Sequence, residues 1–184
     1  MHLKKRNIIT LSILLLTAVA TLGFVYNRSV WRAERAVSSL LRQIEHGNIN
    51  DLNLTIYHAP AISTPFPWSI DNLISAYNDS RVIVDGARLE EYIYVINRLN
   101  DINLTPVRRR TYIDARLYYV FRDRNNRRVL DVAVWGSGGS GNRGRASAFV
   151  NGVEVEWDGI FVEIILPFLP DEAYRVWESS ARRD

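Results

Sequence analysis

An uncharged apolar run of 19 residues, Ile8–Tyr26, constrains this chain more than any other feature. A helix of that length rises about 1.5 Å per residue and matches the roughly 30 Å hydrocarbon core of a bilayer. The basic segment Lys4–Arg6 precedes the run, and such positive clusters stay on the cytoplasmic side. We therefore expect residues 1–6 in the cytoplasm, residues 8–26 across the membrane and residues 29–184 outside.

The same segment has an alternative interpretation as a cleaved signal peptide. Ala18-Val19-Ala20 offers small residues at the cleavage positions, and the mature chain would then begin at Thr21. The apolar run continues past that point to Tyr26, which favours an uncleaved signal-anchor. The chain has no cysteine, so it offers no site for a lipoprotein anchor.

The charge of the chain is balanced outside its first six residues. The formal net charge is +3, from 23 basic and 20 acidic residues, and three of the basic residues form Lys4–Arg6. From residue 7 onward the count is therefore 20 against 20. A balanced chain lacks the positive field that drives nucleic-acid binding, so we expect no nucleic-acid partner despite a pI of 9.3. The lack of cysteine also removes disulfides, thiolate nucleophiles and cysteine-ligated metals.

Apolar periodicity predicts helices and strands typical of an α+β domain. Apolar residues recur at spacings of three and four over Val30–Ile44, which predicts an amphipathic helix that ends at Gly47. Two further helices are expected at 70–77, capped by Ser69, and at 89–99, opened by Asp85. Two more are expected at 160–165 and after Pro170. Strands are expected at 52–58 and 81–84. The predicted organisation is an anchor (1–27), a helical stalk (28–47) and one extracytoplasmic α+β domain (48–184).

The second half of the chain predicts an antiparallel β-meander. Alternating residues predict strands near 111–122, 128–136, 145–150 and 153–157, with turns at Asn125-Asn126 and Asn151-Gly152. The register pairs apolar residues on one face: Phe121 with Leu130, Tyr119 with Val132, Leu117 with Val134, Ala148 with Val155 and Val150 with Val153. We expect the helix over 89–99 to pack on this face. The opposite face, with Asp114, Arg116, Tyr118 and Asp131, is expected to be the wetter one.

Motifs for catalysis are weak. Gly136–Gly141 contains G-x-G-x-x-G, but a dinucleotide-binding loop opens a helix, whereas this one leads into a predicted strand. A kinase glycine loop needs a lysine on a following strand, and no lysine follows Lys5. We therefore interpret the segment as a flexible loop. The histidines beyond the apolar run are His46 and His58, and carboxylate pairs occur at Glu154 and Glu156 and at Glu90 and Glu91. Neither set has the spacing of a metal site or a catalytic triad. We therefore expect no catalytic, cofactor-binding or metal-binding residue.

One basic constellation predicts a binding site for an anion. The hairpin register places the start of the first long strand and the glycine loop at the same end of the sheet. Arginine guanidiniums and glycine amides could there converge on an anionic group. The residues are Arg108, Arg109, Arg110, Arg143, Arg145, Gly138, Gly139 and Gly141. A second cluster at the opposite tip comprises Arg122, Arg124, Arg127 and Arg128. Charged strand ends are also common as solvated edges, and this alternative stays open.

These features predict a single-pass, membrane-anchored binding or interaction module of the bacterial cell envelope. The expected partners are the membrane, through the N-terminal helix, and an envelope protein or an anionic envelope component. The alternatives are an extracytoplasmic hydrolase acting on envelope polymer, a structural partner of another envelope protein, or a secreted protein after cleavage of the signal peptide.

Overall fold

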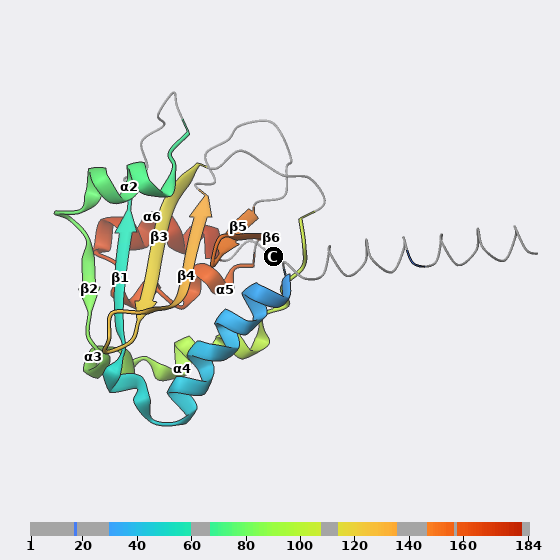
Figure 1. Ribbon diagram of the computed structural model, residues 1–184. Coiled ribbons are helices and arrows are strands. Elements are labelled where there is room, and N and C mark those ends of the chain that lie inside the picture. Colours follow the sequence, from blue (N-terminus) through green and yellow to red (C-terminus); the bar gives the residue numbers. More distant parts are fainter. Residues whose placement is uncertain are drawn as a thin grey trace, which may run out of the picture.

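A six-stranded antiparallel sheet forms the centre of the domain in the computed structural model (Figure 1). The structure describes residues 30–59, 67–107, 114–135, 147–156 and 158–181, together with Thr17. The strands follow the order β2-β1-β3-β4-β5-β6 across the sheet. Their bounds are Asn53–His58 (β1), Val82–Val84 (β2), Ala115–Arg122 (β3), Arg128–Trp135 (β4), Ser147–Val150 (β5) and Val153–Glu156 (β6). The chain therefore forms an α+β domain, as its sequence predicts.

The predicted meander is confirmed as β3 to β6. Each of these strands pairs antiparallel with the next one along the chain. The observed partners are the predicted ones: Phe121 with Leu130, Tyr119 with Val132, Leu117 with Val134, Ala148 with Val155 and Val150 with Val153. The sheet is wider than the meander, because β1 pairs with β3 and β2 pairs with β1.

The first hairpin keeps its predicted register although its turn differs from the prediction. The backbone N–H of Asp123 donates to the Arg127 carbonyl, which leaves a three-residue loop in place of the predicted Asn125-Asn126 pair. Asn126 takes a positive φ of 59°, as such a loop requires. A register shift between the Phe121 and Arg122 pairings absorbs the extra residue. The second turn is confirmed, with φ of 47° at Asn151 and 75° at Gly152.

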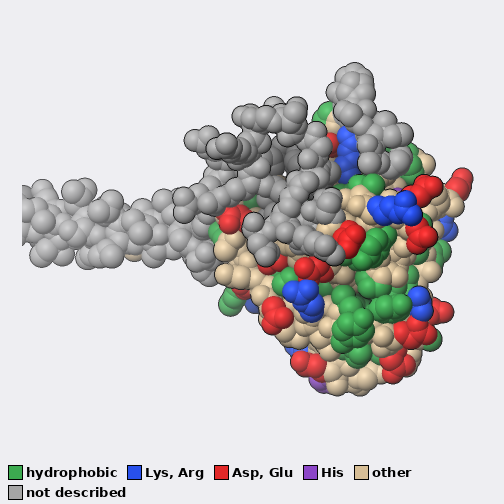
Figure 2. Space-filling model, turned by 180° about the vertical axis from the view of Figure 1, so that it is seen from behind, with side chains coloured by type: hydrophobic (Ala, Val, Ile, Leu, Met, Phe, Trp, Pro, Cys, Tyr) green, Lys and Arg blue, Asp and Glu red, His purple; other side chains and the backbone are tan. Residues whose placement is uncertain are grey.

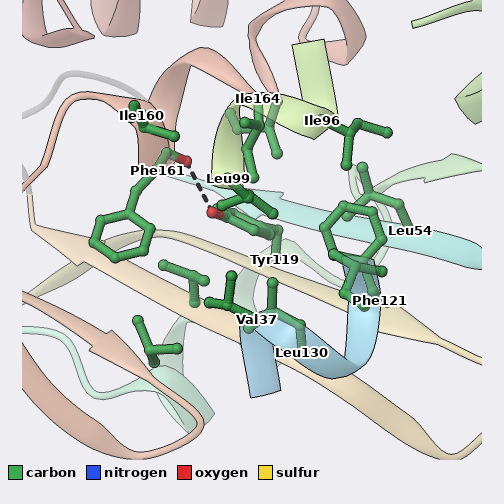
Figure 3. Close-up of a cluster of buried hydrophobic side chains, with 14 of the residues drawn as sticks. Val37, Leu54, Ile96, Leu99, Tyr119, Phe121, Leu130, Ile160, Phe161 and Ile164 are labelled. Carbon is green, nitrogen blue, oxygen red and sulfur yellow. Dashed lines mark hydrogen bonds between the residues drawn. The ribbon is translucent and has the colours of Figure 1, made fainter. Parts of the chain in front are cut away.

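One face of the sheet carries the main hydrophobic core. The elements that cover it are an N-terminal helix (residues 30–45), α3 (Gly86–Glu91), α4 (Ile93–Ile96), η2 (Asn97–Asp101), α5 (Ile160–Glu163), η3 (Leu166–Phe168) and α6 (Asp171–Ala181). In the view of Figure 1, α5 and α6 lie behind the sheet. Figure 3 shows Val37 of the N-terminal helix, Leu99 of η2 and Tyr119 of β3 meeting in this core.

The predicted helix over residues 89–99 packs on this face, but it is not continuous. Leu89, Ile96 and Leu99 are fully buried in the main core, as expected. Asp85 caps α3 by accepting a hydrogen bond of 2.9 Å from the backbone N–H of Arg88. Tyr92, with φ −115° and ψ 21°, interrupts the helix and separates α3 from α4.

The N-terminal helix belongs to the core of the domain. Its predicted apolar stripe is confirmed, since Val30, Ala33, Val37, Leu41 and Ile44 are all buried in the main cluster. This part of the expected stalk therefore contributes to the domain itself. The expected membrane span over residues 8–26 lies outside the described residues except for Thr17. Within the described ranges, no helix has the length and hydropathy needed to cross a bilayer.

The opposite face of the sheet carries a second core, which corrects the prediction of a wet face. Helix α2 (Ile70–Tyr77) begins at its predicted cap, where the Ser69 hydroxyl accepts from the Asn72 N–H at 3.1 Å. Leu73 of α2 is fully buried beside Tyr118 and other residues of this face. The cluster comprises Ala59, Leu73, Ala115, Tyr118, Val120 and Ala133. Tyr118 and Asp131, which we expected to be solvated, are therefore buried.

Candidate binding surfaces

The predicted arginine and glycine site lies outside the described residues. Arg108, Arg109, Arg110, Arg143, Arg145, Gly138, Gly139 and Gly141 all belong to segments that the structure does not describe. The strand ends next to these segments are described, and Ala115 of β3 pairs there with Trp135 of β4. A register shift between Ala115 and Leu117 moves this pair by one residue from the predicted register, which would place Ala115 opposite Gly136. The two strand ends still lie at the same edge of the sheet. The site itself stays a prediction.

The second arginine cluster, at the β3–β4 tip, is largely engaged by neighbouring groups. Arg128 forms an ion pair of 2.7 Å with Asp131, and Arg124 lies 3.9 Å from Asp51. Arg122 donates a hydrogen bond of 3.1 Å to the Asn126 carbonyl. The tip is therefore a mixed surface of both charges, with contacts that also fix the hairpin.

Asp131 is the centre of a buried polar network between the two hairpins. Its carboxylate accepts hydrogen bonds from the Tyr118 hydroxyl (3.1 Å) and the Arg128 guanidinium (2.7 Å), and its backbone N–H donates to Asn151 (2.7 Å). Burial, and secondly the Asp131 charge, raise the pKa of Tyr118 well above its usual range, which keeps the phenol a neutral donor. The Asp131 carboxylate also raises the pKa of Arg128. Each polar group has a partner, so the network serves to hold β4 in place.

The carboxylate pairs considered for catalysis have structural partners. Glu154 accepts a hydrogen bond from Ser147, Glu156 from Thr105 and Glu90 from Asn50, and Glu91 pairs with Arg88. His58 is half-buried at the end of β1, and burial lowers the pKa of its imidazole. In the described part of the chain, no three His, Asp or Glu side chains gather as metal ligands. The hydrolase alternative gains no support from these residues.

A groove lies between the N-terminal helix on one side and η2 with the segment that follows it on the other. Its volume is about 210 Å³. Polar groups form more of its accessible lining than apolar ones do: a carboxylate, a hydroxyl and two amides lie beside apolar side chains that are mostly buried. The lining residues are Glu34, Val37, Ser38, Leu41, Leu99, Asn100, Ile102, Asn103 and Leu104. The sequence predicts the N-terminal helix and a helix over residues 89–99, but neither the segment over residues 100–104 nor its position beside the N-terminal helix, so the groove is not predicted.

The N-terminal helix also carries an exposed aromatic side chain next to the groove-lining residues. Trp31 is 57% exposed, and the Arg35 guanidinium lies 4.7 Å from the centre of its ring. This spacing of four residues places both side chains on one side of the helix. Other exposed large hydrophobic residues are Ile83, Tyr94, Tyr174 and Val176.

Acidic and basic side chains are mixed over the face shown in Figure 2. Hydrophobic side chains gather there in a patch bordered by both charges. This distribution fits the balanced charge of the chain beyond its first six residues. Comparison with protein-family models, curated proteins and solved structures finds no match to this chain.

Proposed function

We propose that this chain is a single-pass, membrane-anchored interaction module of the bacterial cell envelope, with its α+β domain outside the cytoplasmic membrane. The basic segment Lys4–Arg6 and the apolar run Ile8–Tyr26 support the anchor and its orientation. The domain follows closely, because its core already includes Val30. A short connection of this kind would hold the domain near the membrane surface.

The groove beside the N-terminal helix is the observation that carries the binding proposal. Its lining combines a carboxylate, a hydroxyl and two amides with apolar side chains, and protein interfaces likewise combine polar and apolar groups. Its volume of about 210 Å³ is below the roughly 300–1,000 Å³ of typical small-molecule sites. It suits one anchoring side chain of a protein partner.

The position of the groove indicates where the partner lies. Glu34 and Ser38 follow the predicted span by eight and twelve residues, which is about 12 and 18 Å along a continuous helix. The partner is therefore an envelope protein that presents a segment close to the membrane surface. The Glu34 carboxylate in the groove lining would favour a basic residue in that segment.

Site-specific photocrosslinking in intact cells tests the groove. A photoreactive phenylalanine at Ser38 is expected to trap one defined envelope protein, because Ser38 is an exposed groove residue. The same residue placed at Ser75, an exposed serine of α2, is the matched control. The Ser38→Arg variant should lose the complex, whereas Ser75→Arg should keep it. Identical crosslinking at Ser38 and Ser75 would contradict the proposal.

The anchor requires a separate test. Resistance of the intact chain to alkaline extraction from membranes is expected, and so is an N-terminus that precedes the apolar run. If N-terminal sequencing shows that the mature chain begins at Thr21, the signal peptide is cleaved and the protein is secreted, not anchored.

A second contact is proposed at the arginine and glycine site, because the pairing of Ala115 with Trp135 favours its convergence. An anionic envelope component or the anionic face of a partner would bind there, and the attraction would weaken with salt. Reversing the charges of Arg109 and Arg143 together should remove a salt-sensitive interaction and leave the thermal stability nearly unchanged. Unchanged binding to anionic lipid and polymer after that double substitution would show a solvated edge.

A further inference from the structure

We propose that the exposed side of the first turns of the N-terminal helix, formed by Trp31, Arg32 and Arg35, lies in the headgroup layer of the membrane and binds phospholipid phosphates. This inference rests on the anchor in the proposed function, because the chain must cross the membrane just before this helix. It specifies in addition which side of the domain faces the bilayer and which group of the lipid that side binds.

Trp31 has the chemistry of a membrane-interface residue. Its side chain is 57% exposed, whereas Trp177 is 2% exposed. An indole combines a large apolar body with one N–H donor, which is why tryptophan is enriched where the hydrocarbon core meets the headgroups. The exposed indole of Trp31 would be shielded from water in that layer.

Arg35 complements Trp31 for binding a phosphate. Its guanidinium lies over the indole ring at 4.7 Å from the ring centre. A guanidinium in this position keeps several N–H donors in its plane, and these can form charge-assisted hydrogen bonds to phosphate oxygens. Arg32 is exposed in the same turns, where the two arginines outnumber the single carboxylate of Glu34. The local charge is thus positive and would attract anionic headgroups.

The packing of the helix fixes which of its sides the domain covers. Val30, Ala33 and Val37 are buried in the main core, so the helix cannot turn about its axis without opening that core. The side with Trp31 and Arg35 therefore keeps a constant orientation relative to the sheet. Side chains on a helix tilt toward its N-terminus, which here points them back toward the predicted span.

The distance along the chain agrees with the headgroup layer. Trp31 follows Tyr26, the end of the predicted span, by five residues, which is about 7.5 Å along a helix. The headgroup layer is roughly 5–7.5 Å thick on each side of the hydrocarbon core. An extended path of the same length would reach about 17 Å and would leave Trp31 in water. The proposal thus depends on a helical path, and a depth measurement tests it.

Fluorescence quenching by brominated lipids measures this depth. The intact chain is reconstituted into vesicles of phosphatidylcholine and phosphatidylglycerol, with bromine either close to the headgroup or near the bilayer centre. Subtraction of the Trp31→Phe spectrum from that of the intact chain gives the Trp31 component. The Trp68→Phe spectrum gives the control component in the same way, because Trp68 lies just before α2 and packs against the second core on the other face of the sheet. We expect shallow bromine to quench the Trp31 component several-fold more strongly than it quenches the Trp68 component. We also expect shallow bromine to quench the Trp31 component more strongly than deep bromine does.

Two arginine variants test the phosphate contact. Arg35→Gln should reduce the shallow quenching of Trp31, because it removes the charge that holds the indole and binds the phosphate. Arg42→Gln is the matched control, since Arg42 is exposed farther along the same helix and its side chain donates to the Ser38 carbonyl at 3.2 Å. Equal effects of the two variants would overturn the phosphate contact.

Alkaline extraction of the same vesicles separates the two proposals. Equal quenching of the Trp31 and Trp68 components in a chain that resists extraction would overturn the headgroup contact and leave the anchor in place. A chain that alkali removes from the vesicles would overturn both. Strong shallow quenching of Trp31 in a resistant chain supports both.

Discussion

The Tyr119 hydroxyl donates a buried hydrogen bond of 2.9 Å to the backbone carbonyl of Phe161 (Figure 3). Tyr119 lies on β3 and is fully buried, and Phe161 lies in the short helix α5. The last carbonyls of a helix have no intrahelical donor, so they need a partner from outside. Burial raises the pKa of Tyr119 well above its usual range, which keeps the phenol protonated as a donor. The bond thus joins the sheet to the C-terminal helices.

Tyr119→Phe should destabilise the domain by about 1–3 kcal/mol, because it leaves the buried Phe161 carbonyl without this donor. Urea unfolding followed by circular dichroism measures the loss. Tyr94→Phe removes a hydroxyl from a side chain that is 69% exposed, and it should be nearly neutral. Equal losses for the two variants would show that the buried hydrogen bond contributes no net stability.

The stability of the domain should fall below neutral pH partly because of His58. Burial lowers the pKa of His58 from its usual value of 6.5. Below pH 6.5 the unfolded chain binds a proton at His58 before the folded chain does. The free energy of unfolding is therefore undiminished by His58 above pH 6.5, and it decreases as the pH falls toward the pKa of the folded state. One such group changes the unfolding free energy by at most about 1.4 kcal/mol per pH unit.

His58→Gln is therefore expected to flatten the acid side of the stability profile, measured by urea unfolding at a series of pH values. His46→Gln, at an exposed position, controls for the loss of a histidine in general. A slope for His58→Gln equal to that of the unsubstituted chain would contradict the prediction.

Leu73→Ala tests the second core, on the face of the sheet that the sequence predicts to be wet. Leu73 is fully buried, so its truncation should cost about 2–5 kcal/mol. Ser75→Ala, on an exposed position of the same helix, should change stability by less than about 0.5 kcal/mol. Denaturant titrations of both variants measure these changes in the free energy of unfolding. A loss for Leu73→Ala as small as that for Ser75→Ala would restore the prediction of a wet face.

Local patterns predicted the elements and the pairing of this fold well. Alternation paired Tyr119 with Val132, and the Asn151-Gly152 dipeptide marked its turn, because these signals depend on neighbouring residues alone. The second core was missed for a different reason. Tyr118 and Asp131 alternate with apolar residues as on a solvated face, and this alternation does not reveal that Leu73 of α2 packs in one cluster with Tyr118.

The candidate surfaces were less accessible to sequence reasoning. Val37 and Leu104 line the same groove although they are far apart in the chain, and no periodicity of the sequence reveals this. Trp31 could have been noted, since a tryptophan five residues beyond an apolar run is a known interface signal. The arginine and glycine site stays a prediction, because Arg109 and Arg143 lie outside the described residues.

Gly86 is required by a close approach of two backbones. It is buried at the start of α3, where this helix packs against η1 (Asn48–Asp51). A Cβ at Gly86 would lie 2.4 Å from Asn50 Cα and 2.6 Å from the Asn50 carbonyl oxygen. Because these are backbone atoms, no side-chain rotation can relieve the clash.

Gly86→Ala should therefore cost at least the roughly 1–3 kcal/mol typical of overpacked cores, since α3 must move away from η1. The same movement would break the hydrogen bond of 3.2 Å from the Asn50 amide to the Glu90 carboxylate. Ala87→Ser, at the exposed next position, is the control and should be nearly neutral. Urea unfolding gives the free energies, and amide hydrogen exchange over α3 and η1 should rise in Gly86→Ala alone. Unchanged exchange and stability in that variant would mean that the two backbones lie farther apart than the structure has them.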